Sequence, residues 1–228
     1  MATHSIISYD DTQNDQDALM LGRILSNAGS QLTLAYVRHS THAERPREQL
    51  DQQAAQALLD RGAMWLGDDN VQRRVVVNAS TAAGLTRLAE QEGADIVVFG
   101  SEYRTAAGHV APGRSAQALL DGGPTAVAIA PANYRTDSTP AVNWIGVLPG
   151  AADDAALETA RELASHFDAH LADADRGIDL LVVGSRQEAR EGRVMVTAQA
   201  QNAIEQATCP VLVVARGVPI RFHTLVTV

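Results

Sequence analysis

The sequence has no lysine, a single cysteine and no long apolar run. Because all eighteen basic side chains are arginine, a Schiff-base lysine, a Ser–Lys dyad and a lysine-bearing phosphate loop are excluded. The one cysteine, Cys209, excludes an intrachain disulfide and a cysteine cluster that holds a metal. Since Cys209 begins an apolar strand-like run, we expect a small buried thiol rather than a nucleophile.

We infer the cellular location and the excluded partners from the apolar runs, the net charge and the first residues of the chain. No run approaches the ~18 apolar residues that cross a bilayer, and residues 1–5 show neither the basic nor the apolar part of a secretory signal. The net charge of −9 argues against nucleic acid and anionic membranes as partners. We therefore expect a cytoplasmic globular protein, and 228 residues suffice for one large or two small domains.

The stretch 94–131 organises the rest of the chain. Its apolar run 95–99 ends in Gly100-Ser101 and predicts a strand buried on both faces of a parallel sheet. A loop of small residues leads to Gly113 and a predicted helix from Arg114, and a second buried strand follows at 126–130. A strand, a glycine loop and a helix start bring backbone N–H groups together, which suits a phosphate. The alternative is that these glycines only make turns.

The residues before this stretch alternate between strand and helix patterns. Strands are expected at 5–9, 31–38 and 71–77, and helices at 15–28, 47–66 and 80–92. Regular alternation of this kind predicts an α/β fold with a doubly wound, five-stranded parallel sheet of Rossmann-like type. Ligands of such sheets bind at the carboxyl ends of the strands, where Asp10, Val37 and Gly100 are expected.

A weaker copy of the pattern follows a polar linker at 133–141. The run 178–185 repeats the text of 95–101, and 209–215 repeats 124–130, so we expect domains at 1–132 and 142–228. A strand at 143–147 and helices at 153–167 and 194–207 complete the second copy. Because little chain separates residue 167 from 178, about three core strands are expected there. The segment 218–228 alternates partly and is a candidate edge strand.

Taken together, these residues resemble the universal stress protein family, as a tandem chain with a truncated second repeat. The resemblance covers 5–131 and, with pieces missing, about 143–215; its most specific phrases are 94–101 and 208–214. It implies the fold of the adenine nucleotide alpha hydrolases, a stress-response role without enzymatic activity, and a homodimer.

Many members of this family hold ATP or AMP through a motif of three spaced glycines followed by Ser or Thr. Gly100 and Gly113 stand at the first and third glycine positions, whereas Tyr103 replaces the second and Arg114 replaces the Ser or Thr. Tyr103 would hinder close approach of a phosphate, while Arg104 and Arg114 would supply guanidinium donors. The resemblance thus gives these candidate ATP or AMP contacts: Asp10, Val37, Gly100, Ser101, Tyr103, Arg104, Gly113, Arg114 and Ser115.

Simpler roles remain open for several of these residues. Asp10, which the resemblance places at the ribose or base, could instead help to cap the next helix, and Val37, placed beneath adenine, could be plain core. In the second copy Gly150 replaces the acidic residue, Gln187 the second glycine, and Thr197-Ala198 the Gly-Ser pair. No nucleotide is expected there, and the second copy is expected to cover the edge of the first sheet.

Two other functions remain as alternatives to the nucleotide-binding stress protein. One is an interaction module with an empty site that acts through dimerisation, and the other is a slow ATP-hydrolysing enzyme on the same sheet. Since no catalytic motif is evident, we expect no enzyme. His39 and His42 lack a third ligand in sequence, so no metal site is expected. Trp65 and Trp144 are expected in the core or at a domain interface.

Overall fold

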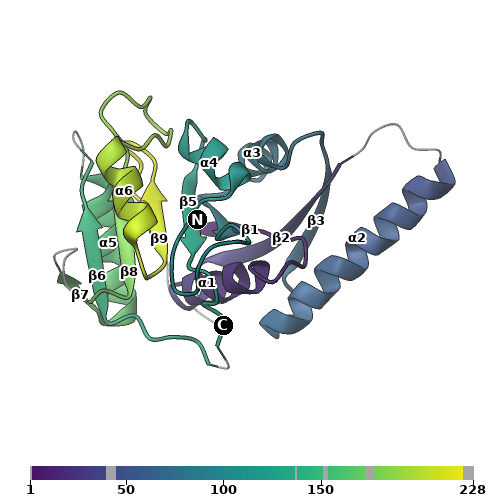
Figure 1. Cartoon of the computed structure of the whole chain (residues 1–228), viewed down its shortest axis with the longest axis horizontal. Coiled ribbons are helices and arrows are strands. Elements are labelled where there is room, and N and C mark those ends of the chain that lie inside the picture. The colour runs from purple at the N-terminus through teal and green to yellow at the C-terminus, as the bar shows by residue number, and fades with distance from the viewer. Residues whose placement is uncertain (1, 40–44, 137, 151–153, 173–176, 223–228) are drawn as a thin grey trace.

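The computed structural model of the chain describes residues 2–39, 45–136, 138–150, 154–172 and 177–222. Within these ranges one continuous sheet of nine strands runs through the molecule (Figure 1), in the order β3-β2-β1-β4-β5-β9-β8-β6-β7. Helices α1, α2 and α5 pack on one face of the sheet, and α3, α4 and α6 pack on the other. No helix of the described part has the length and apolar character that a membrane span needs.

The first half has the predicted α/β alternation. It comprises β1 (His4–Ser8), α1 (Asp15–Asn27), β2 (Gln31–Arg38), α2 (Arg45–Leu66), β3 (Gln72–Val77), α3 (Thr81–Glu92), β4 (Ile96–Gly100), α4 (Arg114–Leu120) and β5 (Ala126–Ala130). All four strand pairs of this half are parallel. The expected five-stranded parallel sheet is confirmed, and each predicted element lies within two residues of its observed bounds.

The second half keeps the same order in shorter form. It comprises β6 (Trp144–Leu148), α5 (Ala155–Phe167), β7 (His170–Ala172), β8 (Leu180–Gly184), α6 (Ala198–Gln206) and β9 (Val211–Val214). The three core strands expected here are β6, β8 and β9. The sequence did not predict the short edge strand β7, which pairs with β6 directly after α5. Helix α6 also begins later than predicted, because Thr197 stands at its N-cap.

The two halves join edge to edge. Strand β9 pairs antiparallel with β5, and Ala128 lies opposite Leu212, its own equivalent in the repeat. Two backbone hydrogen bonds repeat this symmetry: Val110 donates to Ala207 over 3.2 Å, and Val194 donates to Gly123 over 3.0 Å. The second half therefore covers the β5 edge of the first sheet, as expected, and the halves are related by an approximate two-fold axis.

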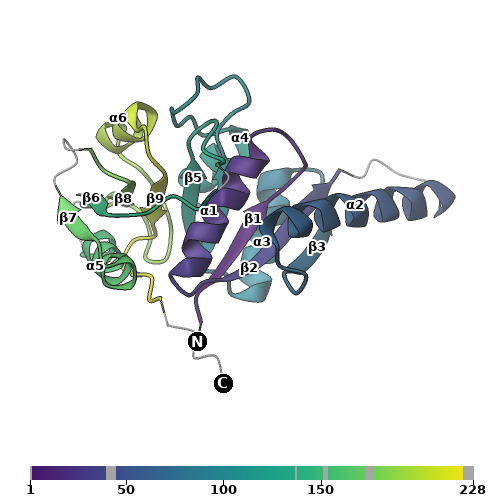
Figure 2. The ribbon, with the colours of Figure 1, turned by 90° about the horizontal axis from the view of Figure 1, so that it is seen from below.

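Each face of the sheet has its own apolar core. In β1, Ile7 faces α1 and Ile6 faces the opposite cluster, and both side chains are fully buried. Figure 2 shows α1 and α5 on one face, with α2 extending beyond the sheet. Trp65 packs against the first cluster as expected, with the Arg23 guanidinium 4.7 Å from its ring centre. The prediction that Trp144 lies in the core or at a domain interface is wrong: it is 40% exposed and lies against His170 of the same half.

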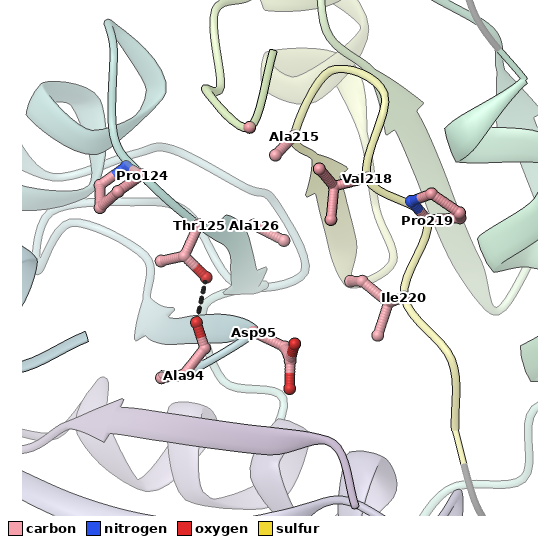
Figure 3. A pocket seen from close by; sticks show the side chains of 10 residues that line it. Ala94, Asp95, Pro124, Thr125, Ala126, Ala215, Val218, Pro219 and Ile220 are labelled. Carbon is pink, nitrogen blue, oxygen red and sulfur yellow. Dashed lines mark hydrogen bonds between the residues drawn. The ribbon is translucent and has the colours of Figure 1, made fainter. Parts of the chain in front are cut away.

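The C-terminal segment ties the halves together at the amino edge of the sheet. Residues 218–222 form no strand, so that part of the predicted edge strand is wrong, and 223–228 lie outside the described residues. Ile220 donates its N–H to Thr159, and Thr3 donates its hydroxyl to the Arg221 carbonyl. A cavity of about 100 Å³ lies at this seam, between Asp95, Thr125 and the segment (Figure 3). This edge lies opposite to the carboxyl ends of the strands.

Candidate functional site

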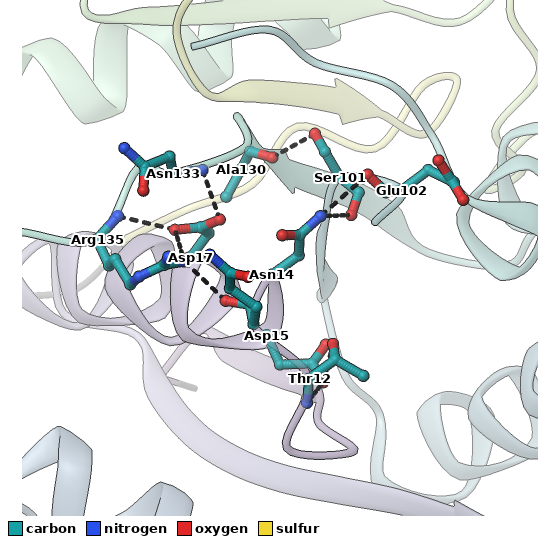
Figure 4. A network of polar contacts seen from close by, with 10 residues as sticks. Thr12, Asn14, Asp15, Asp17, Ser101, Glu102, Ala130, Asn133 and Arg135 are labelled. Atoms are coloured by element: carbon teal, nitrogen blue, oxygen red, sulfur yellow. Dashed lines mark hydrogen bonds and ion pairs between the residues drawn. The ribbon is translucent and has the colours of Figure 1, made fainter. Parts of the chain in front are cut away.

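The turns that leave β1 and β4 meet at the carboxyl edge of the first half, because these strands are neighbours in the sheet. Asn14, the N-cap of α1, bridges them: its amide donates to the carbonyls of Ser101 over 2.8 Å and Glu102 over 2.9 Å (Figure 4). A Cβ atom on Gly100 would collide with the backbone carbonyl oxygen of Asn14. Glycine is therefore required at position 100 by the close approach of α1.

The hydroxyl of Ser101 holds the following loop in place. Ser101 is buried and donates to the carbonyl of Ala130 over 2.7 Å, at the end of the neighbouring strand β5. The same oxygen accepts the N–H of Ala111 over 3.2 Å. Both strand ends and the returning loop are thus fixed by one side chain, whose hydroxyl is engaged within the protein.

The loop from Ser101 to α4 is open and carries cationic side chains. Tyr103 is 69% exposed, and the Arg104 guanidinium lies 5.0 Å from the centre of its ring. Gly113 is the N-cap of α4 and provides no side-chain cap, and a Cβ atom there would meet nothing within 4 Å. Arg114 is exposed and Ser115 half-buried in the first turn of the helix. A helix start with free N–H groups beside guanidinium groups favours an anion.

Asp10 and Val37 lie at the ends of adjacent strands. Asp10 is exposed directly after β1, and it does not cap α1, since Asn14 occupies the N-cap. Val37 is buried, and in α3 a Cβ atom at Gly84 would press against its side chain. The side chain of Val37 therefore belongs to the core, and only its backbone is left for a ligand.

Two further carboxyl groups in the β1–α1 turn have opposite surroundings. Asp15 accepts hydrogen bonds on one oxygen from the N–H of Asp10 (3.0 Å) and from the N–H and hydroxyl of Thr12 (2.9 and 2.8 Å). Burial, reinforced by the neighbouring Asp10 carboxyl, raises the pKa of Asp15 to about 8. In contrast, hydrogen bonds from the Tyr9 hydroxyl and then from Arg61 lower the pKa of Asp11.

Asp17 fastens the linker between the halves to α1. Its carboxylate is fully buried and accepts the N–H groups of Asn133 and Arg135, each over 2.8 Å, and it pairs with the Arg135 guanidinium (Figure 4). Neither Asp15 nor Asp17 was expected from the sequence to have such a role. The available signal was an aspartate on the apolar face of a helix, where a buried carboxylate needs partners.

The second half repeats the backbone contacts of this edge, but its helix start carries a side-chain cap. A Cβ atom on Gly184 would collide with the backbone nitrogen of Gly150, and Ser185 donates to Val214 over 2.7 Å, as Ser101 does to Ala130. Unlike Gly113, however, Thr197 caps its helix, accepting the N–H of Ala200 over 3.0 Å. Gly150 also provides no carboxylate where the first half has Asp10.

The sequence itself matches a family model. The model described as "Universal stress protein family" matches residues 5–131 and 169–215, which together make up more than half of the chain. The chain belongs to the universal stress protein family. Its match in two segments agrees with two unequal copies of the universal stress fold, joined through β5 and β9.

Solved structures share this architecture at low sequence identity. A universal stress protein from Archaeoglobus fulgidus is 14% identical, with a TM-score of 0.68 over 94% of this chain and 98% of that one. A functionally unknown protein from Pseudomonas aeruginosa is 13% identical, with a TM-score of 0.58 over 93% of this chain and 92% of its own. Among curated proteins there is no significant match. At these identities the structural likeness establishes the universal stress fold alone.

Cys209, His39 and His42 are the other side chains that were considered for chemistry or metal binding. Cys209 is buried, and burial, with Asp179 adding to it, raises the pKa of its thiol to about 12, so the thiol stays protonated. His39 lies 3.2 Å from the Thr81 hydroxyl, and His42 lies outside the described residues. In the part of the chain that the structure describes, no three His, Cys, Asp or Glu side chains form a group that could hold a metal.

Proposed function

We propose that the first half holds one adenine nucleotide, ATP or AMP, at the carboxyl edge of its sheet, and that the protein acts by binding rather than catalysis. The proposal is carried by one observation: the start of α4 is open above Gly113, whereas Thr197 closes the equivalent helix start in the second half. Membership of the universal stress protein family supports the choice of ligand.

Each candidate residue has a role that its position permits. Asp10, an exposed carboxylate, accepts hydrogen bonds from ribose hydroxyls, while the backbone of Val37 contacts adenine. The N–H groups that follow Gly113 and the Ser115 hydroxyl bind a phosphate. Gly100 and Ser101 hold the floor of the loop in place.

The guanidinium groups of this loop fit retention of the nucleotide. Arg104 and Arg114 are exposed, and guanidinium groups pair with phosphate oxygens through their N–H donors rather than acting as general acids or bases. We therefore propose a stress-response protein without enzymatic activity. Phosphate release from ATP and magnesium at a rate proportional to protein concentration would overturn this part of the proposal.

The two domains have different tasks in this proposal. Residues 1–132 form the ligand-holding unit, and 142–228 form a unit that covers the β5 edge. Because β9 already occupies that edge, a homodimer would have to use another surface. The cytoplasmic location and the homodimer remain predictions.

Calorimetric titration with ATP and with AMP tests the proposal. We expect binding with one site per chain, loss of binding in Gly113→Thr, and unchanged binding in the mirror variant Thr197→Gly. The mirror variant controls for effects of altering a helix cap in the same fold. Absence of heat at millimolar nucleotide in the unmodified protein would remove the nucleotide from the proposal.

A second candidate, the nucleotide-free interaction module, is favoured by Tyr103. A large exposed aromatic ring with a guanidinium over its face is typical of protein contact sites, and it stands where the family motif has glycine. This candidate predicts that Gly113→Asp leaves partner binding unchanged and that Tyr103→Ala weakens it.

A further inference from the structure

Helix α2 comes close to the end of β1 at Gly62, a glycine inside the helix. A Cβ atom at this position would lie 2.9 Å from the ring of Tyr9, so a side chain there would push α2 away from the strand. The preceding residue, Arg61, reaches the turn that follows β1. Its guanidinium also donates to the carbonyl of Ala57 over 3.2 Å, which fixes the direction of the side chain along α2.

Arg61 contacts Asp11, whose backbone has a left-handed conformation with φ at 64°. This conformation is unfavourable for residues with a side chain, although aspartate tolerates it better than most. One oxygen of the Asp11 carboxylate accepts the Nε–H of Arg61 over 2.8 Å and lies 2.6 Å from its Nη2 atom. The other oxygen accepts the hydroxyl of Tyr9 over 2.7 Å. Side chains from β1 and α2 therefore hold the turn in a conformation that its backbone does not favour.

The same turn carries Asp10, whose side chain is exposed at the carboxyl edge of the sheet. Asp10 lies between Tyr9 and Asp11, and its N–H donates to the Asp15 carboxylate over 3.0 Å. Its backbone is thus fixed from both sides. The described part of the second half has no counterpart of α2, the helix that supplies Arg61.

We propose that Arg61 is a positioning residue for the nucleotide site: through Asp11 it holds the β1–α1 turn in the conformation that directs Asp10 to the ribose hydroxyls. The role toward ribose rests on the proposed nucleotide function, whereas the hold on the turn does not. Because both members of the ion pair are partly exposed, its removal should leave the protein folded, and its effects can be measured in folded variants.

The hold on the turn is tested without any ligand, by hydrogen exchange at the N–H groups of Asp10 and Thr12, which are both hydrogen bonded within the turn. We expect exchange to be about two- to fivefold faster in Arg61→Gln. The matched control is Arg73→Gln, which removes a 3.0 Å ion pair between β3 and Asp60 of the same helix and should leave this exchange unchanged. Unchanged exchange in Arg61→Gln would overturn the proposal.

The role toward ribose is tested by comparing the affinities for ATP and for 2′,3′-dideoxy-ATP, which lacks both ribose hydroxyls. We expect the unmodified protein to prefer ATP by about tenfold, since the hydroxyls donate to a carboxylate. Arg61→Gln should weaken ATP binding about two- to fivefold and leave the affinity for the dideoxy analogue unchanged. Arg73→Gln should bind both as the unmodified protein does. Equal weakening of both ligands in Arg61→Gln would indicate a general structural effect and would overturn the positioning role.

A second variant tests whether Arg61 acts through Asp11. Asp11→Ala removes the carboxylate that Arg61 binds, together with the partner of the Tyr9 hydroxyl, so its loss of ATP affinity should exceed that of Arg61→Gln. Adding Arg61→Gln to Asp11→Ala should then cause no further loss, because the two residues act as one unit. Losses that multiply in the double variant would contradict the proposal.

The failures of the two proposals can be told apart. Absence of ATP binding in the unmodified protein would overturn the proposed nucleotide function and the role of Arg61 toward ribose with it. In that case hydrogen exchange would still decide whether Arg61 holds the turn. Binding of ATP without preference over the dideoxy analogue would overturn the role toward ribose and leave the nucleotide in place.

Discussion

The two halves share a scaffold and differ in what they leave open. In both, a glycine at the end of a strand allows a neighbouring backbone to approach, and the serine after it bonds to the next strand. At equivalent positions the halves differ: the first has the exposed carboxylate of Asp10 where the second has Gly150, and Gly113 leaves α4 without the side-chain cap that Thr197 gives to α6. The comparison teaches that the Gly-Ser pair is required for folding, while capacity for a ligand depends on the residues around it.

The halves also differ in the helices and strands that they contain. The second half has no counterpart of α2, β3 and α3 among its described residues, and its outer strand β7 leaves Trp144 and Leu171 partly exposed. The closing strand–helix–strand unit, β8 to β9, is complete because it forms the joint with β5. The predictions below test this comparison, from the largest expected effect to the smallest.

Loss of the Asp17 carboxylate should lower the free energy of unfolding most, because it leaves the linker groups that it binds without a partner. Asp17→Ala removes a fully buried carboxylate that fixes Asn133 and Arg135, and we expect about 3–5 kcal/mol of lost unfolding free energy. Urea unfolding measures the change. The control is Glu188→Ala, which removes an exposed ion pair and should cost under about 0.5 kcal/mol. Equal effects of the two variants would contradict the role of Asp17.

The strand-end glycines should be equally intolerant in both halves. Gly100→Ala and Gly184→Ala each force a methyl group against backbone, at an expected cost of about 2–3 kcal/mol. Gly113→Ala, which meets open space, should change stability by less than about 0.5 kcal/mol. Denaturant midpoints compare the three variants. A tolerated Gly100→Ala would show that this glycine is kept for a ligand after all.

The raised pKa of the Asp15 carboxyl should give the first half a pH dependence of its own. The pKa of Asp15 is raised from 3.8 to about 8, so between these values the native state holds a proton that the unfolded chain has released. Stability therefore falls as the pH rises through this window, and Asp15→Asn should be more stable than the unmodified protein by about 1–3 kcal/mol at pH 8. Unfolding at pH 5 and 8 measures the difference, which should shrink at the lower pH.

The serine hydroxyls offer a matched pair of smaller changes. Ser101→Ala and Ser185→Ala each leave a strand-end carbonyl and a loop N–H without their partner, at an expected cost of about 1–2 kcal/mol. Thermal unfolding should rank them as equal. If only Ser101→Ala abolished ATP binding at unchanged stability, the hydroxyl would be a ligand contact rather than part of the scaffold.

The helix caps should give the smallest change in stability. Thr197→Ala removes the cap of α6 and should cost about 1 kcal/mol, whereas Gly113→Thr adds a cap to α4 and should leave stability unchanged or slightly higher. Calorimetric unfolding would detect both. A large loss of stability in Gly113→Thr would mean that the open helix start is not free space.

The sequence predicted the regular elements of the first half because strand and helix periods extend over many residues there. It missed β7, since three residues are too few for a period to register. It could not reveal that Gly100 and Ser101 also hold the scaffold, because their contacts with Asn14 and Ala130 are made by residues remote in sequence. The positions of Asp10 and Gly113 at one edge were predictable from strand order, whereas the raised pKa of Asp15 depends on its burial in the folded turn.

The central claim, that only the first half holds a nucleotide, is tested most directly by hydrogen exchange of the unmodified protein with and without saturating ATP. The account predicts added protection at residues 10–15 and 101–116, with none at the equivalent residues 185–200. Protection of both segments, or of neither, would contradict it.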